Sequence, residues 1–165
     1  MNAELTTFLA VYMPALIANG SATLINKGHP IDAGRRFLDG RRVLGDGKTV
    51  EGFLLGTLYS ISVALTLANV LTEPLVAYYG ITAGLGALIG DILGSFIKRR
   101  LGLERGAHAP LLDQLDFMLG AYAATYAAGY TPPPALALGF LAVVYVLHRL
   151  TNMAAYKLGI KPVPW

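Results

Sequence analysis

The sequence contains no cysteine, so disulfide bonds and thiolate sites are excluded. Charged residues are also scarce, at 14% of the 165 residues against about 25% in a typical soluble domain, while apolar residues make up 55%. That balance excludes an ordinary soluble domain. The apolar runs are continuous and lack the alternating polarity of about ten-residue strands, which excludes a membrane β-barrel. A helical membrane protein is the class that remains.

Five long apolar runs predict an all-α, polytopic integral membrane protein with five transmembrane helices in one domain, residues 1–165. A helix needs about 20 residues to cross about 30 Å of hydrocarbon. The predicted spans are residues 5–25, 50–71, 75–97, 111–130 and 135–156, with loops at 26–49 and 98–110. The N-terminal residues lack the basic segment of a signal peptide, so we expect the first run to be retained as a span.

Basic residues are absent from the connectors near 72–74 and 129–134. All thirteen lie in loop 26–49, loop 98–110 and residues 149–161. The positive-inside bias then predicts a cell-membrane protein with its N-terminus outside and its basic loops in the cytosol. Topology and phosphate binding explain the net charge of +3, so no nucleic-acid partner is expected.

Three aspartates, Asp91, Asp113 and Asp116, lie within or beside spans on the predicted cytosolic side. Asp91 precedes Lys98 by seven residues, roughly 10 Å along a helix. Ionisable groups at such depth are costly and are therefore functional candidates. Unpaired carboxylates at one depth repel each other, and a divalent cation relieves the repulsion. Oxygen ligands favour Mg²⁺, so we predict a magnesium site held by these three residues.

Other polar residues are predicted at the same end of the spans. Ser95 shares a helix face with Asp91 and Lys98, and Asn19 and Asn26 lie toward the same end of the first span. Together they predict a polar cavity that faces the cytosol and is closed toward the outside. An asparagine in a membrane helix also often bonds a neighbouring helix, so that alternative stays open for Asn19.

Loop 26–49 is rich in glycine and basic residues and leads directly into the second span. Its end, Gly45-Asp46-Gly47-Lys48-Thr49, lacks the preceding strand and the spacing of a P-loop. A basic, glycine-rich loop at a helix N-terminus still suits polyphosphate, so Lys48 is a candidate phosphate ligand. Gly86, Gly90 and Gly94 recur every fourth residue and predict close approach of another helix.

Two segments resemble a known signature, in which Gly-Asp is followed by Ser, by Lys-Arg and then by Asp-x-x-Asp. They are Gly90-Asp91-Ile92-Leu93-Gly94-Ser95-Phe96-Ile97-Lys98-Arg99 and Asp113-Gln114-Leu115-Asp116. The signature is that of the CTP:phospholipid cytidylyltransferases. With its five-span length, the chain looks like the CDP-archaeol synthases of archaea. Ala107-His108-Ala109-Pro110 stands where the related CDP-diacylglycerol synthases have Pro-Gly-His-Gly-Gly, which argues against that branch.

The resemblance implies transfer of a cytidylyl group from CTP to the phosphate of an isoprenoid ether lipid, with Mg²⁺ as cofactor. Asp91, Asp113 and Asp116 would then hold the metal, and Lys48, Lys98 and Arg99 would hold phosphates. The catalytic set is expected to be Lys48, Asp91, Lys98, Arg99 and Asp116. Asn19, Asn26, Lys27 and Ser95 would line the nucleotide site. Whether His29, Asp32, Asp46, His108 and His148 belong to the site stays open, as does the oligomeric state.

Three alternatives come from other classes. A small transporter or ion channel would need a polar path across the whole membrane, but the outer half offers little beyond Asn69 and Glu73. A CDP-alcohol phosphotransferase would need an Asp-x-x-Asp-Gly-x-x-Ala-Arg pattern, which is absent. A purely structural membrane protein has no need of buried acids beside bases.

Overall fold

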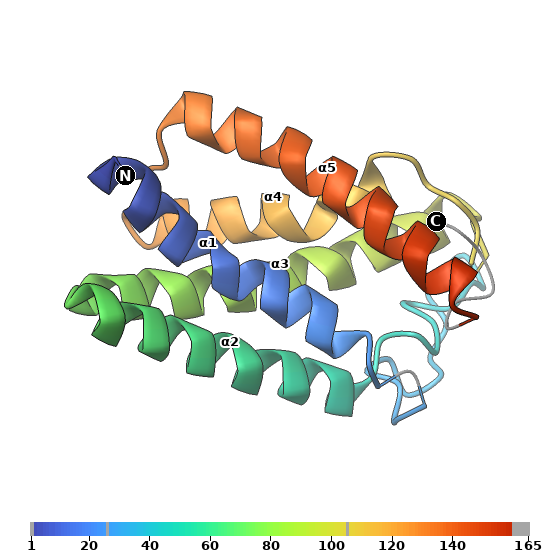
Figure 1. The fold of residues 1–165 in the computed structure, drawn as a ribbon. Helices are drawn as coiled ribbons and strands as arrows, with labels where there is room; N and C mark the ends of the chain where they lie inside the picture. Colours follow the sequence, from blue (N-terminus) through green and yellow to red (C-terminus); the bar gives the residue numbers. More distant parts are fainter. Residues whose placement is uncertain (1, 26, 105, 160–165) are drawn as a thin grey trace.

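The computed structural model describes residues 2–25, 27–104 and 106–159, which fold into five helices (Figure 1). They are α1 (Ala3–Ala22), α2 (Val50–Leu71), α3 (Pro74–Arg100), α4 (Leu112–Ala127) and α5 (Pro134–Lys157). Within the described residues there is no strand, only isolated bridges between Pro30 and Thr49 and between Arg36 and Arg42. The predicted all-α class is therefore confirmed.

The helix boundaries follow local capping signals. The Asn2 side chain caps α1 by accepting from the Glu4 N–H at 3.1 Å, and Thr49 caps α2 through the Gly52 N–H at 3.1 Å. Pro74 and Pro134 are the first residues of α3 and α5, positions where a missing N–H costs nothing. The bounds of α2 match the prediction, whereas α1 ends three residues earlier than expected.

Helix α3 continues three residues beyond the predicted span. Lys98, Arg99 and Arg100 therefore belong to its last turn and not to the loop that was predicted to begin at residue 98. Basic side chains at this position interact favourably with the negative end of the helix dipole. The difference matters for the site, because a helix orients these side chains far more firmly than a loop would.

Helix α4 is shorter than the predicted span 111–130. Leu111 has a positive φ of 66°, so the helix begins one residue late, at Leu112; it ends three residues early, at Ala127, and runs for 16 residues. That length is about 24 Å, short of the roughly 30 Å hydrocarbon core. By length and apolar composition, α1, α2, α3 and α5 are long enough to cross a membrane.

Helix α3 is the centre of the bundle and packs against α1, α2 and α4. The glycines predicted to admit a neighbouring helix do so on the α4 side. A Cβ atom on Gly86 would lie 2.6 Å from the Gly120 carbonyl oxygen, and one on Gly90 would lie 2.4 Å from the Asp116 carbonyl oxygen. The two backbones are thus close enough to exclude any side chain, as in other small-residue helix contacts.

Helix α5 lies along the outside of the bundle and packs mainly against α4 (Figure 1). Only Val144 and Asn152 of this helix are buried, while Val143, Val146 and Leu150 are exposed. Large apolar side chains are also exposed along α2, at Leu54, Leu58 and Leu65. Exposed apolar surface on this scale is typical of contact with lipid.

The bundle has two different ends (Figure 1). One end, which we call the turn end, carries the short connections 72–73 and 128–133, which contain no Lys or Arg. The other, the loop end, carries residues 23–25, 27–49, 101–104 and 106–111. The core near the turn end is aromatic: Tyr12 is fully buried, its hydroxyl lies 2.8 Å from that of Thr125, and its ring packs edge-on to Tyr122. The polar pockets described below lie at the loop end.

Candidate active site

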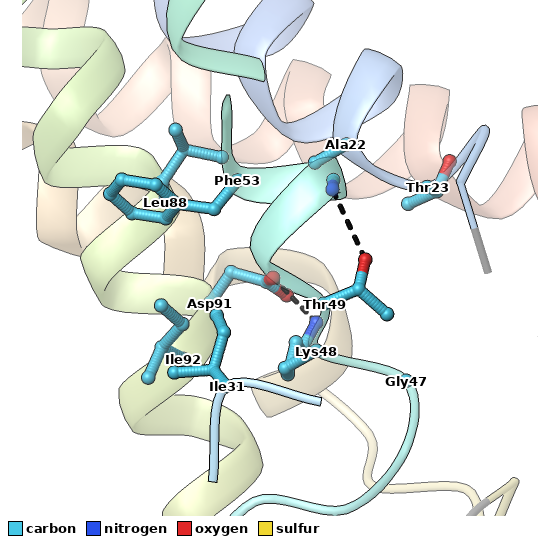
Figure 2. A pocket seen from close by; sticks show the side chains of 11 residues that line it. Ala22, Thr23, Ile31, Gly47, Lys48, Thr49, Phe53, Leu88, Asp91 and Ile92 are labelled. Carbon is cyan, nitrogen blue, oxygen red and sulfur yellow. Dashed lines mark hydrogen bonds and ion pairs between the residues drawn. The ribbon is translucent and has the colours of Figure 1, made fainter. Parts of the chain in front are cut away.

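Lys48 and Asp91 meet at the loop end, between the N-terminus of α2 and the middle of α3. Lys48 Nζ lies 2.5 Å from Asp91 Oδ2, and each side chain is about one-fifth exposed, at 21% and 20%. The backbone of Lys48 is fixed because the Ile31 N–H donates to its carbonyl at 2.8 Å. Figure 2 shows this pair at the edge of a small pocket lined by Phe53 of α2 and Leu88 of α3.

A second ion pair joins α3 to α4. Lys98 Nζ lies 2.7 Å from Asp113 Oδ1, and the other carboxylate oxygen accepts from the Ala109 N–H at 2.8 Å. Both side chains are mostly buried, at 17% and 15% exposed. The prediction of three unpaired aspartates is therefore wrong for Asp91 and Asp113. Lysines from sequence-distant segments neutralise both, and a partly buried carboxylate is costly without such a partner.

Asp116 lies one helical turn after Asp113 and is buried against α3. Its Oδ1 accepts from the Phe117 N–H at 2.7 Å, and its Oδ2 sits in the notch left by Gly94. Within the described residues, no three acidic or histidine side chains converge closely enough to hold an ion together. The ion pairs explain this arrangement, because Asp91 and Asp113 are each drawn toward a lysine.

The notch at Gly94 yields a prediction for stability. A Cβ atom there would lie 2.0 Å from Asp116 Oδ2 and 2.8 Å from Asp116 Cβ, so Gly94→Ala forces the helices or the carboxylate to move. We expect a destabilisation of about 1–3 kcal/mol, measured as a lower thermal midpoint in detergent. Gly139→Ala on α5 is the matched control, because a Cβ there meets nothing within 4 Å. A Gly94→Ala protein as stable as the control would contradict this packing.

Two pockets at the loop end are lined by basic side chains. The first, which we call the lysine pocket, has a volume of about 150 Å³ and is lined by Lys48, Ser95, Lys98 and Arg99 together with Gly45 and Gly47. The second, the arginine pocket, has a volume of about 390 Å³ and is lined by Arg41, Arg42, Arg99, Asp46 and Glu104. Gly45 and Arg99 line both pockets, so the two adjoin. A run of cationic side chains around connected cavities is suited to a polyanion.

Arg99 is the least satisfied of these cations. Its Nε is buried and has no hydrogen-bond partner within the part of the chain that the structure describes. A buried donor without a partner costs free energy, so Arg99 is the residue of this pocket wall with the most to gain from an anionic partner. Arg42, in contrast, is already engaged by Asp32 at 2.8 Å and by Asp46 at 2.7 Å.

The structure brings together most of the predicted site residues. Lys48, Asp91, Ser95, Lys98 and Arg99 line connected pockets, and Asp113 and Asp116 lie beside them on α4. Lys27 is exposed and Asn19 is half-buried in α1, and neither lines any of these pockets. Asn26 lies outside the described residues.

Of the residues whose place in the site was left open, Asp46 lines the arginine pocket, whereas His29 and His148 line neither pocket. His29 is exposed and pairs with Glu51, a contact that raises the pKa of the imidazole, chiefly through their hydrogen bond. The His148 ring centroid lies 6.3 Å from that of Phe117, and His148 does not line the lysine pocket. Sequence reasoning missed Arg41 and Arg42, which it treated as topology signals, and left Asp32 unassigned. The high density of charged residues and glycines in loop 26–49 was the feature of the sequence that could have indicated their role.

Comparisons with known proteins agree with this arrangement. Residues 3–165 match the family described as CarS-like, CDP-archaeol synthase. The chain is 58% identical over 162 residues to a CDP-archaeol synthase of Hyperthermus butylicus, covering 98% of this chain and 96% of the relative. It is 48% identical to the CDP-archaeol synthase of Methanopyrus kandleri, covering 98% and 94% of the two chains.

A solved structure is also similar. It is described as an intramembrane enzyme for archaeal membrane lipid biosynthesis, and it superposes with a TM-score of 0.82 at 46% identity, covering 88% of this chain and 92% of the other. Both the sequence and the fold therefore agree with the resemblance carried by the Gly-Asp and Asp-x-x-Asp segments. The chain belongs to the CDP-archaeol synthase family, and it is a membrane-embedded enzyme of the cytidylyltransferase type.

Proposed function

We propose that this enzyme transfers a cytidylyl group from CTP to the phosphate of 2,3-di-O-geranylgeranylglycerol 1-phosphate, giving CDP-archaeol and diphosphate. The observation that carries the proposal is the convergence of Lys48 and Lys98 on one pocket, each opposite an aspartate. Family membership supplies the reaction class. The pocket supplies cations from α3 and from the loop before α2, which is what a triphosphate requires.

The reaction depends more on neutralising the negative charge of its two substrates than on transferring a proton. A phosphate oxygen of the lipid attacks the α-phosphorus of CTP, and the bond between that phosphorus and the bridging oxygen to the β-phosphate breaks. Diphosphate leaves with the electron pair. The second pKa of a phosphate monoester is near 6, so the attacking oxygen is already ionised at neutral pH. No general base is then required, and the main difficulty is bringing two polyanions together.

Lys48, Lys98 and Arg99 are assigned to the phosphates. Lys48 and Lys98 hold their ammonium groups at the pocket wall through Asp91 and Asp113, so they are ordered before the nucleotide arrives. Arg99 adds a guanidinium whose Nε has no partner among the described residues. Cations already held at the pocket wall have only a short way to move to reach phosphate, where they stabilise the charge that develops on the departing diphosphate.

Asp91, Asp113 and Asp116 are assigned to Mg²⁺. The donor set fits, because carboxylate oxygens are the ligands that hard cations prefer. Asp91 and Asp113 each carry a lysine ammonium group, a positive charge in the place that a cation would take. When bound, Mg²⁺ would neutralise phosphate charge. Nucleotide binding draws the lysines toward phosphate and frees the carboxylates, so we expect the cation and CTP to bind together.

The assay that tests this function uses purified protein in detergent or nanodiscs. CTP, Mg²⁺ and the geranylgeranyl ether-lipid phosphate are supplied, and the release of diphosphate is measured. We expect release only when all three are present, with CDP-archaeol formed in equal amount. Diphosphate release without the lipid, or no release with all three, would contradict the proposal.

We further propose that α4 and the residues after it form a fifth span, with the N-terminus outside the cell and the pockets facing the cytosol. The distribution of basic residues supports this orientation, because the turns 72–73 and 128–133 contain none.

Cysteine labelling tests the orientation cleanly, because the chain has no cysteine of its own. Gly40→Cys, in the loop between α1 and α2, is expected to react with a membrane-impermeant maleimide only after the cells are opened. Thr72→Cys, in the turn between α2 and α3, is expected to react in intact cells. The reverse pattern would place the pockets outside.

A further inference from the structure

Asp32 lies in the loop between α1 and α2, and its side chain is almost completely enclosed, at 1% exposed. Its carboxylate accepts from three backbone N–H groups, those of Gly34 at 3.1 Å, Leu44 at 2.9 Å and Gly45 at 3.0 Å. Arg42 adds two more donors, Nε at 3.3 Å and Nη2 at 2.8 Å. An ionised carboxylate has about four lone-pair sites, so these donors saturate it and leave none for a ligand.

The donors also keep the group charged. Burial acts to raise the pKa of Asp32, but the hydrogen bonds from Arg42 and from the backbone of Gly45, Leu44 and Gly34 outweigh burial, and the pKa lies well below its ordinary value. Asp32 is therefore ionised throughout the neutral range. The folded loop depends on that charge, because an uncharged acceptor would bind the guanidinium and three amides more weakly.

The backbone groups that Asp32 holds form a wall of the lysine pocket. Leu44 and Gly45 line that pocket directly, and Gly45 has a φ of 98°, a conformation that favours glycine. The Lys48 N–H points back to the Gly45 carbonyl at 3.4 Å. Ile31, the residue before Asp32, donates its N–H to the Lys48 carbonyl at 2.8 Å. Asp32 thus restrains the backbone of Lys48 on both sides: its N–H through Gly45, which Asp32 binds, and its carbonyl through Ile31, the residue before Asp32.

We propose that Asp32 is a positioning residue for nucleotide binding, which acts by holding the turn 44–48 so that Lys48 faces the phosphates of a nucleoside triphosphate. The proposal rests on the proposed function, in which Lys48 is a phosphate ligand. Asp32 does not touch substrate, since its carboxylate is already saturated. Its effect is expected to fall on CTP, because the turn borders the lysine pocket.

The test compares Asp32→Asn with a matched control in the full-length protein. Asp39→Asn is suited as that control, because Asp39 in the same loop also accepts from a backbone N–H, that of Arg41 at 3.0 Å, and from an arginine, Arg100 at 2.9 Å. Neither Asp39 nor Arg100 lines the lysine pocket. CTP binding is measured by calorimetry in the presence of Mg²⁺, and KM values for CTP and for the lipid phosphate are measured separately.

Asp32→Asn is expected to weaken CTP binding and to raise the KM for CTP by about tenfold or more, because the point of attachment of Lys48 shifts. The KM for the lipid and the kcat at saturating CTP are expected to stay within about threefold of wild type. Asp39→Asn is expected to leave CTP binding within about twofold. A purely structural role predicts a different split, with kcat and thermal stability reduced and the KM for CTP unchanged, and that result would overturn the proposal.

A second variant covers the case in which Asp32→Asn does not fold. Asp32→Glu keeps the charge but moves the carboxylate by one methylene, so it cannot satisfy all of its donors at once. The same selective rise in the KM for CTP is expected, and an unchanged value would overturn the proposal. The calorimetric comparison also separates the two claims. If wild type bound CTP without turnover, the proposed reaction would fail, while weaker binding by Asp32→Asn would still support the positioning role.

Discussion

Asp91→Asn and Asp116→Asn are each expected to lose nearly all turnover in the diphosphate-release assay while the protein still folds. Asparagine keeps the volume of aspartate but removes the charge that a magnesium ligand needs. Both residues lie beside the lysine pocket, Asp91 through its pair with Lys48 and Asp116 in the notch at Gly94. Residual activity within about tenfold of wild type, ~1.4 kcal/mol in barrier, would reject a metal role for that residue.

The same two variants are expected to differ in stability without ligand. Asp91→Asn leaves the Lys48 ammonium group, which is only 21% exposed, without its carboxylate partner, so the thermal midpoint should fall. Asp116 forms no ion pair within the described residues, where Lys48 and Lys98 pair with Asp91 and Asp113, so Asp116→Asn should leave the midpoint unchanged or raise it. Glu73→Gln at the turn end is the control and should affect neither activity nor stability strongly. Equal midpoints for the Asp91 and Asp116 variants would contradict the ion-pair account.

Much of the fold was accessible from the sequence because helices in a membrane are marked by long apolar runs. The predicted α2 is correct at both ends, and the α5 bounds differ by one residue each. The errors lie where local backbone geometry decides. The positive φ of Leu111 delays α4 by one residue, and the favourable placement of basic residues at a helix C-terminus extends α3 through Arg100. Hydropathy carries no signal for either feature.

The site was partly predictable for a related reason. Asp91, Ser95 and Lys98 share a helix face by spacing alone, so their convergence on connected pockets followed once α3 formed. The pairing of Lys48 with Asp91 and of Lys98 with Asp113 did not follow, because it depends on how loop 23–49 and α4 pack against α3. Spacing along the sequence does not show which residues of separate elements will come into contact. The role of Asp32 was hidden for the same reason, since its partners lie up to 13 residues away in the loop.

Lys48→Ala and Lys98→Ala are expected to reduce kcat/KM for CTP by about ten- to hundredfold, the loss of roughly 1.5–3 kcal/mol for a charge-assisted contact with phosphate. The KM for the lipid should change little, because both ammonium groups line the lysine pocket, which is assigned to the triphosphate. Lys27→Ala is the matched control: Lys27 is an exposed lysine from the same loop as Lys48 that lines none of the pockets described, and its loss should cost no more than about twofold.

The ion pairs add a prediction for metal binding by the same two variants. Each alanine variant also frees a carboxylate, Asp91 or Asp113, which then has no neutralising ammonium group. Binding of Mn²⁺ without nucleotide, followed by electron paramagnetic resonance, should therefore become tighter than in wild type even though CTP is used less well. Lys48→Arg is not expected to restore CTP use, because a planar guanidinium and a compact ammonium fill different space. If only the KM for the lipid rose, both lysines would instead bind the acceptor phosphate, and the triphosphate would lie in the arginine pocket.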